Sequence, residues 1–194
     1  QAKGLNVGIK HFFANDQETH RSGLDTFATE QTLREICMRM FEGAFVEGHT
    51  LSTMLGTNNI GITSASQHKG SLLDVLRGEW GFKGLVMSDW NAGKDAVTSI
   101  AAGNDMLQPG LPKQYEAIVK GVQDGALDEA ILNQNVKRIL EMILQTPHFK
   151  GYKYSNKPDL KAHAAVTRQS ATEGMVLLKN DNGALPLAAD GKNV

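Results

Sequence analysis

Short apolar runs alternate with longer helical patterns along most of the chain. The apolar runs predict four short strands, over residues 5–13, 50–55, 84–87 and 103–107. Apolar positions at helical spacing predict helices over residues 32–47, 69–80 and 95–102. The run at 84–87 is continuous, which is typical of a strand buried on both faces. The alternation therefore predicts an α/β protein whose parallel sheet has right-handed crossovers.

The first helix has two compatible starting points in the sequence. Thr32 and Glu35 have the spacing of a capping box, in which each side chain bonds the other residue's backbone N–H. Thr29 is the alternative N-cap, three residues earlier. The pattern alone leaves both starts open.

The second half of the chain is mainly helical. Residues 113–123 have a helical pattern, and Asp128 is a favourable N-cap for the next helix. Leu127 and Leu132 flank that cap at the spacing of a hydrophobic staple. We expect this second helix to bury one apolar face, formed by Leu132, Val136, Ile139, Leu140 and Ile143.

The pattern also predicts the domain organisation. Residues 150–162 are polar and without periodicity, so we interpret them as a linker after a first domain at 1–149. A last helix is predicted at 164–178, within a second domain that starts at 163. Residue 1 is not Met, and residues 184–187 and 191–194 resemble a turn into a strand that does not follow. We therefore expect a piece of a longer protein.

Two architectures fit the first domain, a doubly wound open sheet and part of a (β/α)₈ barrel. A whole barrel needs about 250 residues, so residues 1–149 would form about half of one. In both architectures functional side chains gather at the carboxyl ends of the strands.

Composition narrows the function classes. Of 194 residues, 41% are hydrophobic, which is enough for a sizeable core. The chain has 20 basic and 21 acidic residues, and this balance of charge argues against nucleic acid or an anionic membrane as the main partner. The apolar runs are too short for a transmembrane helix. A single cysteine, Cys37, excludes an internal disulfide, and the compartment is left undetermined.

Three polar clusters follow predicted strands and are candidates for chemistry. They are Lys10-His11, Thr57-Asn58-Asn59 and Ser88-Asp89-Trp90. Asp89 has the chemistry of a nucleophile, a metal ligand, a general base or a structural acceptor. Trp90 offers an apolar face of the kind on which sugar rings stack. Lys10 and His11 would donate hydrogen bonds to hydroxyls, although an ordinary ion pair and a loop-closing histidine explain them as well.

Several motif classes are absent from the sequence. It contains no H-E-x-x-H zinc motif, no nucleotide-binding glycine motif and no P-loop. Ser88 does not lie in a G-x-S-x-G elbow. The sequence therefore predicts neither a metal nor a cofactor.

Four blocks together resemble one known family. Lys10-His11-Phe12, Asn15, Gln17-Glu18 and Arg21 resemble the K-H-F-x-x-N-x-Q-E-x-x-R signature of glycoside hydrolase family three. Residues 76–84, leading to Val-Met-Ser-Asp-Trp at 86–90, are similar to its nucleophile block. Residues 103–110 resemble its G-x-D-x-x-x-P-G segment, and 173–180 with 185–187 resemble the entry into its second domain. The blocks follow the family order over nearly the whole chain.

The resemblance implies the C-terminal half of a (β/α)₈ TIM-type barrel, a linker and the start of an α/β sandwich domain. It implies a retaining, exo-acting β-glycosidase similar to β-glucosidases, which needs no cofactor and acts on a small carbohydrate. Asp89 would be the nucleophile, Lys10 and His11 would hold sugar hydroxyls, and Trp90 would wall the site. The acid/base glutamate would come from the second domain, beyond this chain. The remaining motif residues, Asn15, Gln17, Glu18 and Arg21, would orient their loop.

One position departs from the family pattern. Many members have an aromatic residue before Asn58, where this chain has Thr57. This departure keeps a second hypothesis open, a non-catalytic sugar-binding or inactive remnant of the family. The family's N-acetylglucosaminidase branch is disfavoured, because residues 13–16 lack its P-G-x-G segment. We expect the isolated chain to have little activity, because half a barrel exposes its sheet edges.

Overall fold

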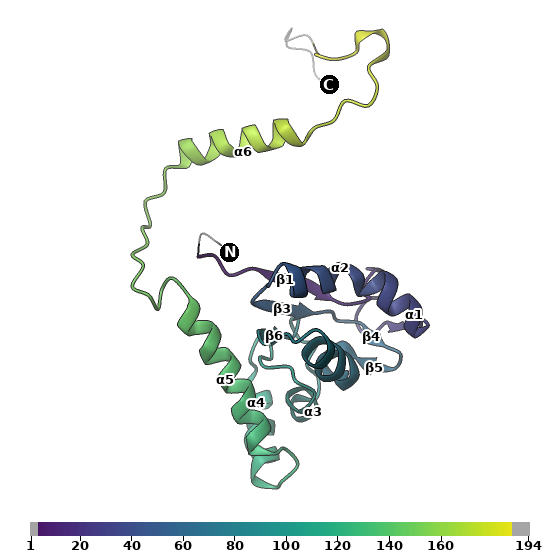
Figure 1. The fold of residues 1–194 in the computed structure, drawn as a ribbon, viewed down its shortest axis with the longest axis vertical. Coiled ribbons are helices and arrows are strands. Elements are labelled where there is room, and N and C mark those ends of the chain that lie inside the picture. The colour runs from purple at the N-terminus through teal and green to yellow at the C-terminus, as the bar shows by residue number, and fades with distance from the viewer. Residues whose placement is uncertain (1–3, 188–194) are drawn as a thin grey trace. The chain divides into compact units, whose positions relative to one another are not determined.

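The structure is a computed structural model that describes residues 4–187, and the chain divides into two units between Tyr152 and Lys153 (Figure 1). The strands are β1 (Gly8–Phe12), β2 (Asp25–Thr26), β3 (Ser52–Leu55), β4 (Asn59–Ile60), β5 (Thr63–Ser64) and β6 (Leu85–Met87). The α-helices are α1 (Glu30–Thr32), α2 (Arg39–Glu42), α3 (Ala96–Ala101), α4 (Pro112–Gln123), α5 (Glu129–Gln145) and α6 (Leu160–Gly174). Further helical segments are η1 (Leu33–Cys37), η2 (Gly43–Glu47), η3 (Ala65–Gln67), η4 (Gly70–Glu79) and η5 (Asp181–Gly183).

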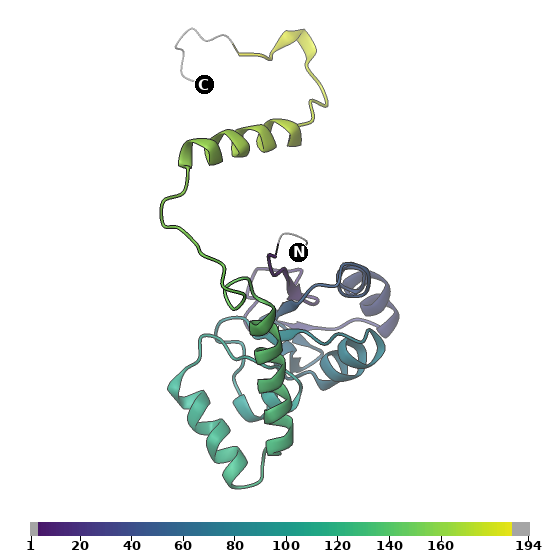
Figure 2. The ribbon, with the colours of Figure 1, turned by 60° about the vertical axis from the view of Figure 1, so that its left-hand side comes forward.

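A parallel sheet forms the centre of the first unit. Its order is β1-β3-β6, with Gly8 opposite Ser52 and Thr53 opposite Val86. The helical stretch from α1 to η2 connects β1 to β3, and η4 connects β3 to β6 (Figure 2). The α/β class and the parallel pairing expected from the sequence are therefore observed.

A second, smaller sheet was not predicted from the sequence. It has the order β2-β4-β5, and each of its strands has only two residues. Such short strands contain too few side chains to produce an alternating pattern. Their pairing depends instead on the loops that follow β1 and β3.

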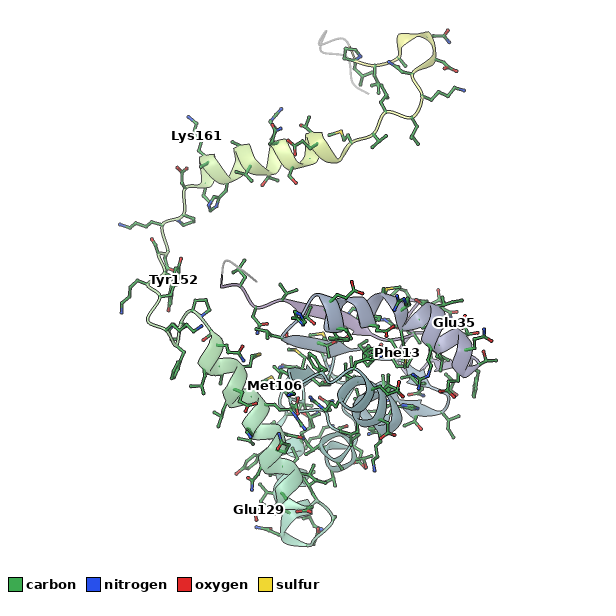
Figure 3. All side chains as sticks on the ribbon, in the orientation of Figure 1. Phe13, Glu35, Met106, Glu129, Tyr152 and Lys161 are labelled. Atoms are coloured by element: carbon green, nitrogen blue, oxygen red, sulfur yellow. The ribbon has the colours of Figure 1, made fainter. Side chains whose placement is uncertain are left out.

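An aromatic cluster fills the space between the parallel sheet and its crossover helices. Phe12 is buried at the end of β1, with ring centroids 4.9 Å from Phe13, 5.3 Å from Phe41 and 5.7 Å from Phe45. Phe13 lies in the interior of the unit, whereas Glu35 projects from its outer surface (Figure 3). Burial of these rings fixes the end of β1, because aromatic side chains contribute much of the apolar area in a core.

The first helix begins at Thr29, the alternative that the sequence left open. The Thr29 hydroxyl accepts a hydrogen bond from the backbone N–H of Thr32 at 3.2 Å. The expected capping box between Thr32 and Glu35 is wrong, because the Glu35 carboxylate instead accepts bonds from Gln31 one turn earlier. The helical stretch thus begins at Glu30, two residues before the predicted start at residue 32.

The predicted strand at 103–107 is wrong. Only an isolated parallel bridge joins Met87 to Met106 there. The backbone N–H of Val86, which a strand neighbour would bond through a carbonyl, donates to the side chain of Asp105 at 2.8 Å. A side chain therefore replaces part of the backbone ladder.

The buried face of α5 also differs from the expectation. Its cap agrees with the prediction, since the Asp128 carboxylate accepts from the N–H of Ala130 at 2.8 Å. Leu127 and Leu132 pack in one cluster, as the staple requires. However, the buried side chain of α5 is Asn135, while the exposed ones include Val136, Leu140 and Ile143. The helix turns a polar side inward because Asn135 donates to the carbonyl oxygens of Ile100 and Asn104, at 3.0 and 3.3 Å.

In the second unit, α6 occupies Leu160–Gly174 rather than residues 164–178. The Asp159 carboxylate caps it by accepting from the N–H of Ala162 at 2.9 Å, so the helix begins inside the stretch expected to be a linker. It ends at Gly174, after which Met175 has an extended backbone. The sequence feature expected at 191–194 lies outside the described residues.

Candidate active site

Asp89 lies just beyond the carboxyl end of β6, where the sequence predicted it. Its side chain is 16% exposed. One carboxylate oxygen, Oδ1, accepts a hydrogen bond from the backbone N–H of Trp90 at 2.7 Å. The other oxygen, Oδ2, is 3.6 Å from Nε2 of His11. Asp89 therefore has one oxygen held by the backbone and one that faces the neighbouring strand end.

His11 comes from β1, two strands away from β6 in the sheet. Burial is the main reason that the pKa of His11 lies below its ordinary value, and the Lys10 cation lowers it further. The Asp89 carboxylate opposes this shift. The lowered pKa favours the neutral imidazole at neutral pH, whose contact with the Asp89 carboxylate is one between a dipole and a charge and leaves a nitrogen able to bond a hydroxyl.

The other two predicted site residues are exposed. Lys10 precedes His11 in β1, and among the described residues it forms no ion pair within 4 Å. Trp90 is 65% exposed and adjoins Asp89 through its backbone N–H. The structure thus brings His11, Asp89 and Trp90 together, while the Lys10 charge acts on His11.

The motif residues after β1 bond mainly to their own loop. Arg21 Nε lies 3.3 Å from Glu18 Oε2, and the Gln17 side chain donates to the carbonyl oxygen of Thr19 at 2.9 Å. The Asn15 side-chain oxygen is buried without a partner among the described atoms. These internal bonds organise the loop beside His11.

Thr57 lies in the loop between β3 and β4, where the sequence departs from the family pattern. Its hydroxyl is buried and has no hydrogen-bond partner among the described residues. The next residue, Asn58, is fully buried and donates to the carbonyl oxygens of Phe13 and Ala14, at 3.2 and 3.1 Å. Asn58 therefore ties the ends of β3 and β1 together, and Thr57 is fixed in place by its neighbour.

A buried ion cluster behind β6 was missed by the sequence analysis. The Asp105 carboxylate pairs with Arg77 Nη2 at 2.7 Å and with Arg138 Nη1 at 2.9 Å. Burial raises the pKa of Asp105, and the two guanidinium groups oppose that rise. Two of the resembling blocks contain Arg77 and Asp105, which was the available signal, but nothing in the sequence paired them.

No group of three or more His, Cys, Asp or Glu side chains suited to a metal ion occurs within residues 4–187. Within the same residues, no helix is long and apolar enough to cross a membrane. A groove of about 700 Å³ includes Leu51 and Gly84, which lie at the start of β3 and β6, so it is at the opposite strand end from Asp89.

Comparisons with known proteins point to one family. A profile of the "Glycosyl hydrolase family 3 N terminal domain" matches residues 1–142. "Thermostable beta-glucosidase B" of Acetivibrio thermocellus is 39% identical over 194 residues, covering 98% of this chain and 25% of that protein. "Exo-alpha-(1->6)-L-arabinopyranosidase" of Bifidobacterium longum is 37% identical, covering 97% of this chain and 25% of that protein.

A solved structure is similar over the same range. The structure of beta-glucosidase 3B from Thermotoga neapolitana in complex with glucose superposes with a TM-score of 0.88 and 42% identity. The superposition covers 96% of this chain and 27% of that one. This chain thus spans about a quarter of the length of the relatives it matches.

Proposed function

Because this chain belongs to glycosyl hydrolase family 3, we propose that it is the nucleophile-bearing part of a retaining, exo-acting β-glycosidase. In this proposal residues 1–149 form the C-terminal half of a (β/α)₈ barrel, 150–162 a linker, and 163–194 the start of an α/β sandwich domain. The parallel order β1-β3-β6 with helical crossovers supports the barrel. The remaining barrel strands and the second domain would belong to the same longer polypeptide.

The observation that carries the proposal is the placement of Asp89. Its carboxylate lies at a strand's carboxyl end, partly exposed, with one oxygen bonded to a backbone N–H and the other toward His11. In a retaining mechanism such a carboxylate attacks the anomeric carbon as the glycosidic C–O bond breaks. A second carboxyl group, about 5–5.5 Å away, gives a proton to the leaving oxygen and then takes one from the attacking water. That acid/base group would come from the second domain.

The neighbours of Asp89 have roles that follow from their positions. Uncharged His11 and cationic Lys10 would donate hydrogen bonds to hydroxyls of the sugar ring. Trp90, exposed beside the nucleophile, would cover the apolar face of that ring. None of these groups forms a covalent bond to the anomeric carbon in this proposal. Their role would be to bind and orient the sugar.

The names of the relatives indicate which terminal sugars to test in this site. Relatives of similar identity are named beta-glucosidases and an exo-alpha-(1->6)-L-arabinopyranosidase. A terminal glucoside is the first substrate to test, because several of the similar solved structures are complexes with glucose.

The proposal is tested by trapping the covalent intermediate in a complete protein that contains this chain. We expect a 2-deoxy-2-fluoro-glucoside with a good leaving group to add one sugar mass to the peptide that contains Asp89. Asp89→Asn would abolish labelling and lower kcat/KM by at least about 10³-fold, since a covalent nucleophile is lost. Turnover that survives in this variant within about tenfold would refute the assignment.

Thr57 favours a second candidate, a sugar-binding protein without turnover. The buried, unpartnered Thr57 hydroxyl supplies no hydrogen bond to Asp89 in the described structure. Under this candidate, calorimetry of the complete protein would detect glucose binding while the fluoro-sugar leaves no adduct.

A further inference from the structure

Asp105 bonds the strand that carries Asp89. Its Oδ2 accepts from the backbone N–H of Val86, in the middle of β6, at 2.8 Å. The carbonyl oxygen of Val86 accepts from the backbone N–H groups of Asp105 and Met106, at 2.9 and 3.1 Å. Both polar backbone groups of Val86 are therefore satisfied by the segment that begins at Asp105.

The same segment also forms hydrogen bonds with residues on both sides of Asp89 in the sequence. The Ser88 N–H donates to the carbonyl oxygen of Met106 at 2.9 Å, and the buried Ser88 hydroxyl accepts from the N–H of Gln108 at 2.8 Å. Beyond the nucleophile, the N–H of Asn91 donates to the carbonyl oxygen of Gln108 at 3.1 Å. The backbone is thus fixed one residue before Asp89 and two residues after it.

Two arginines hold the Asp105 carboxylate in place. Arg77 pairs with it and also donates to the carbonyl oxygens of Gly84 and Gly103, at 3.1 and 3.2 Å, where β6 and the Asp105 segment begin. Arg138 of α5 pairs with the other oxygen and donates to Asn135. The Asp105 side chain has no exposed surface, and a buried carboxylate bonded on both oxygens has little freedom to move.

We infer that Asp105, clamped by Arg77 and Arg138, is a positioning residue that sets where Asp89 stands at the end of β6. This inference rests on the proposed function of Asp89. The physical reason is geometric: a nucleophile displaced by about 1 Å can lose about 10²-fold in rate. The clamp joins the block at residues 103–110 to the block that contains the nucleophile, through Asp105 and Arg77.

The test uses the complete protein and Arg138, the more exposed of the two arginines that pair with Asp105. Arg138 is 14% exposed and lies on α5, and Arg138→Met removes one half of the clamp while keeping a side chain of similar length. Arg138→Lys keeps the charge. Glu79→Gln is the matched control, because it removes the charge from the exposed Arg34–Glu79 pair, with bonds of 2.6 and 2.9 Å, which lies outside the clamp.

We expect Arg138→Met to lower kcat by about 10–100-fold with KM within about threefold. Arg138→Lys should recover part of that loss, and Glu79→Gln should match the wild type. If the Asp105→Asn protein folds, its kcat should fall at least as much as that of Arg138→Met. Wild-type kcat in a folded Arg138→Met protein, even with a lower melting temperature, would overturn the inference.

A second readout separates this inference from the proposed function. Hydrogen exchange of the peptide spanning residues 86–91 should be faster in Arg138→Met than in Glu79→Gln. If the wild type shows no turnover, the proposed function fails, and faster exchange still supports positioning of Asp89. Equal exchange in the two variants would reject it.

Discussion

The protonation of His11 decides the character of its 3.6 Å contact with Asp89. Burial and the neighbouring cations Lys10 and Arg21 lower the pKa of His11, while Asp89 and Glu18 raise it by less. The folded protein therefore prefers the neutral imidazole more strongly than the unfolded chain does.

Because of this preference, the free energy of unfolding depends on pH. Because the pKa of His11 is lower in the folded than in the unfolded state, its contribution is fully present above about pH 6.5. It is lost as the pH falls toward the folded pKa, since the unfolded state then binds more protons. We expect His11→Gln to reduce the loss of unfolding free energy between pH 7 and 5, measured by urea denaturation.

His68 is the matched comparison, because burial also lowers its pKa. Its Nδ1 accepts from the backbone N–H of Ser71 at the start of η4, far from Asp89 in the chain. His68→Gln should remove a separate part of the acid-induced loss. Identical pH slopes for wild type and His11→Gln would contradict the assignment to His11.

At the scale of elements, β6 depends on the close approach of Gly84 to the backbone of Leu51, just before the strand begins. Gly84 stands just before the strand, and a Cβ atom there would overlap the backbone carbonyl oxygen of Leu51 and the ring of Phe82. Leu85 N–H donates to that same Leu51 oxygen at 3.0 Å. Glycine at this position therefore allows β6 to enter the sheet beside β3.

The matching prediction compares two glycine-to-alanine changes. Gly84→Ala should destabilise the protein by about 1–3 kcal/mol, because the added methyl meets backbone that cannot yield. Gly43→Ala should stabilise it by about 0.4–1 kcal/mol, since Gly43 is helical and its Cβ would meet nothing within 4 Å. Chemical denaturation of both variants measures the difference, and equal effects would refute the close approach.

At the scale of the whole molecule, much apolar surface of the first unit is uncovered. On α5, Val136, Leu140, Ile143 and Leu144 are between 42 and 53% exposed. Contiguous apolar surface of this kind is normally an interface in a larger structure or a cause of association. The relatives, about four times as long as this chain, have additional sequence that would cover it.

We accordingly expect the isolated 194-residue chain to self-associate and to lack glycosidase turnover. Leu140→Lys with Leu144→Lys should reduce the association, because both side chains are about half exposed and no core contact is lost. Sedimentation analysis checks the association. A monomer with a cooperative melt followed by circular dichroism would contradict this prediction.

The strands and helices of the first unit could largely be placed from periodicity, because each buries enough apolar surface to leave a pattern. Asp89 could be selected as well, since a polar residue after an apolar run marks a strand's carboxyl end. The buried face of α5 could not be predicted, because in the sequence Asn135 and Arg138 cannot be distinguished from polar residues that face solvent. Their burial depends on carbonyl and carboxylate partners more than 30 positions away.

The sequence by itself determined the α/β class, the order of the three main parallel strands and their crossover helices, and the family. These features depend on local patterns and on motifs that are read within a few residues. Only the tertiary structure decided that Asp105 replaces a strand's bond to Val86 and that burial lowers the pKa of His11 beside Asp89. Both outcomes arise from burial and from contacts between distant segments, whose energies no local pattern of residues specifies.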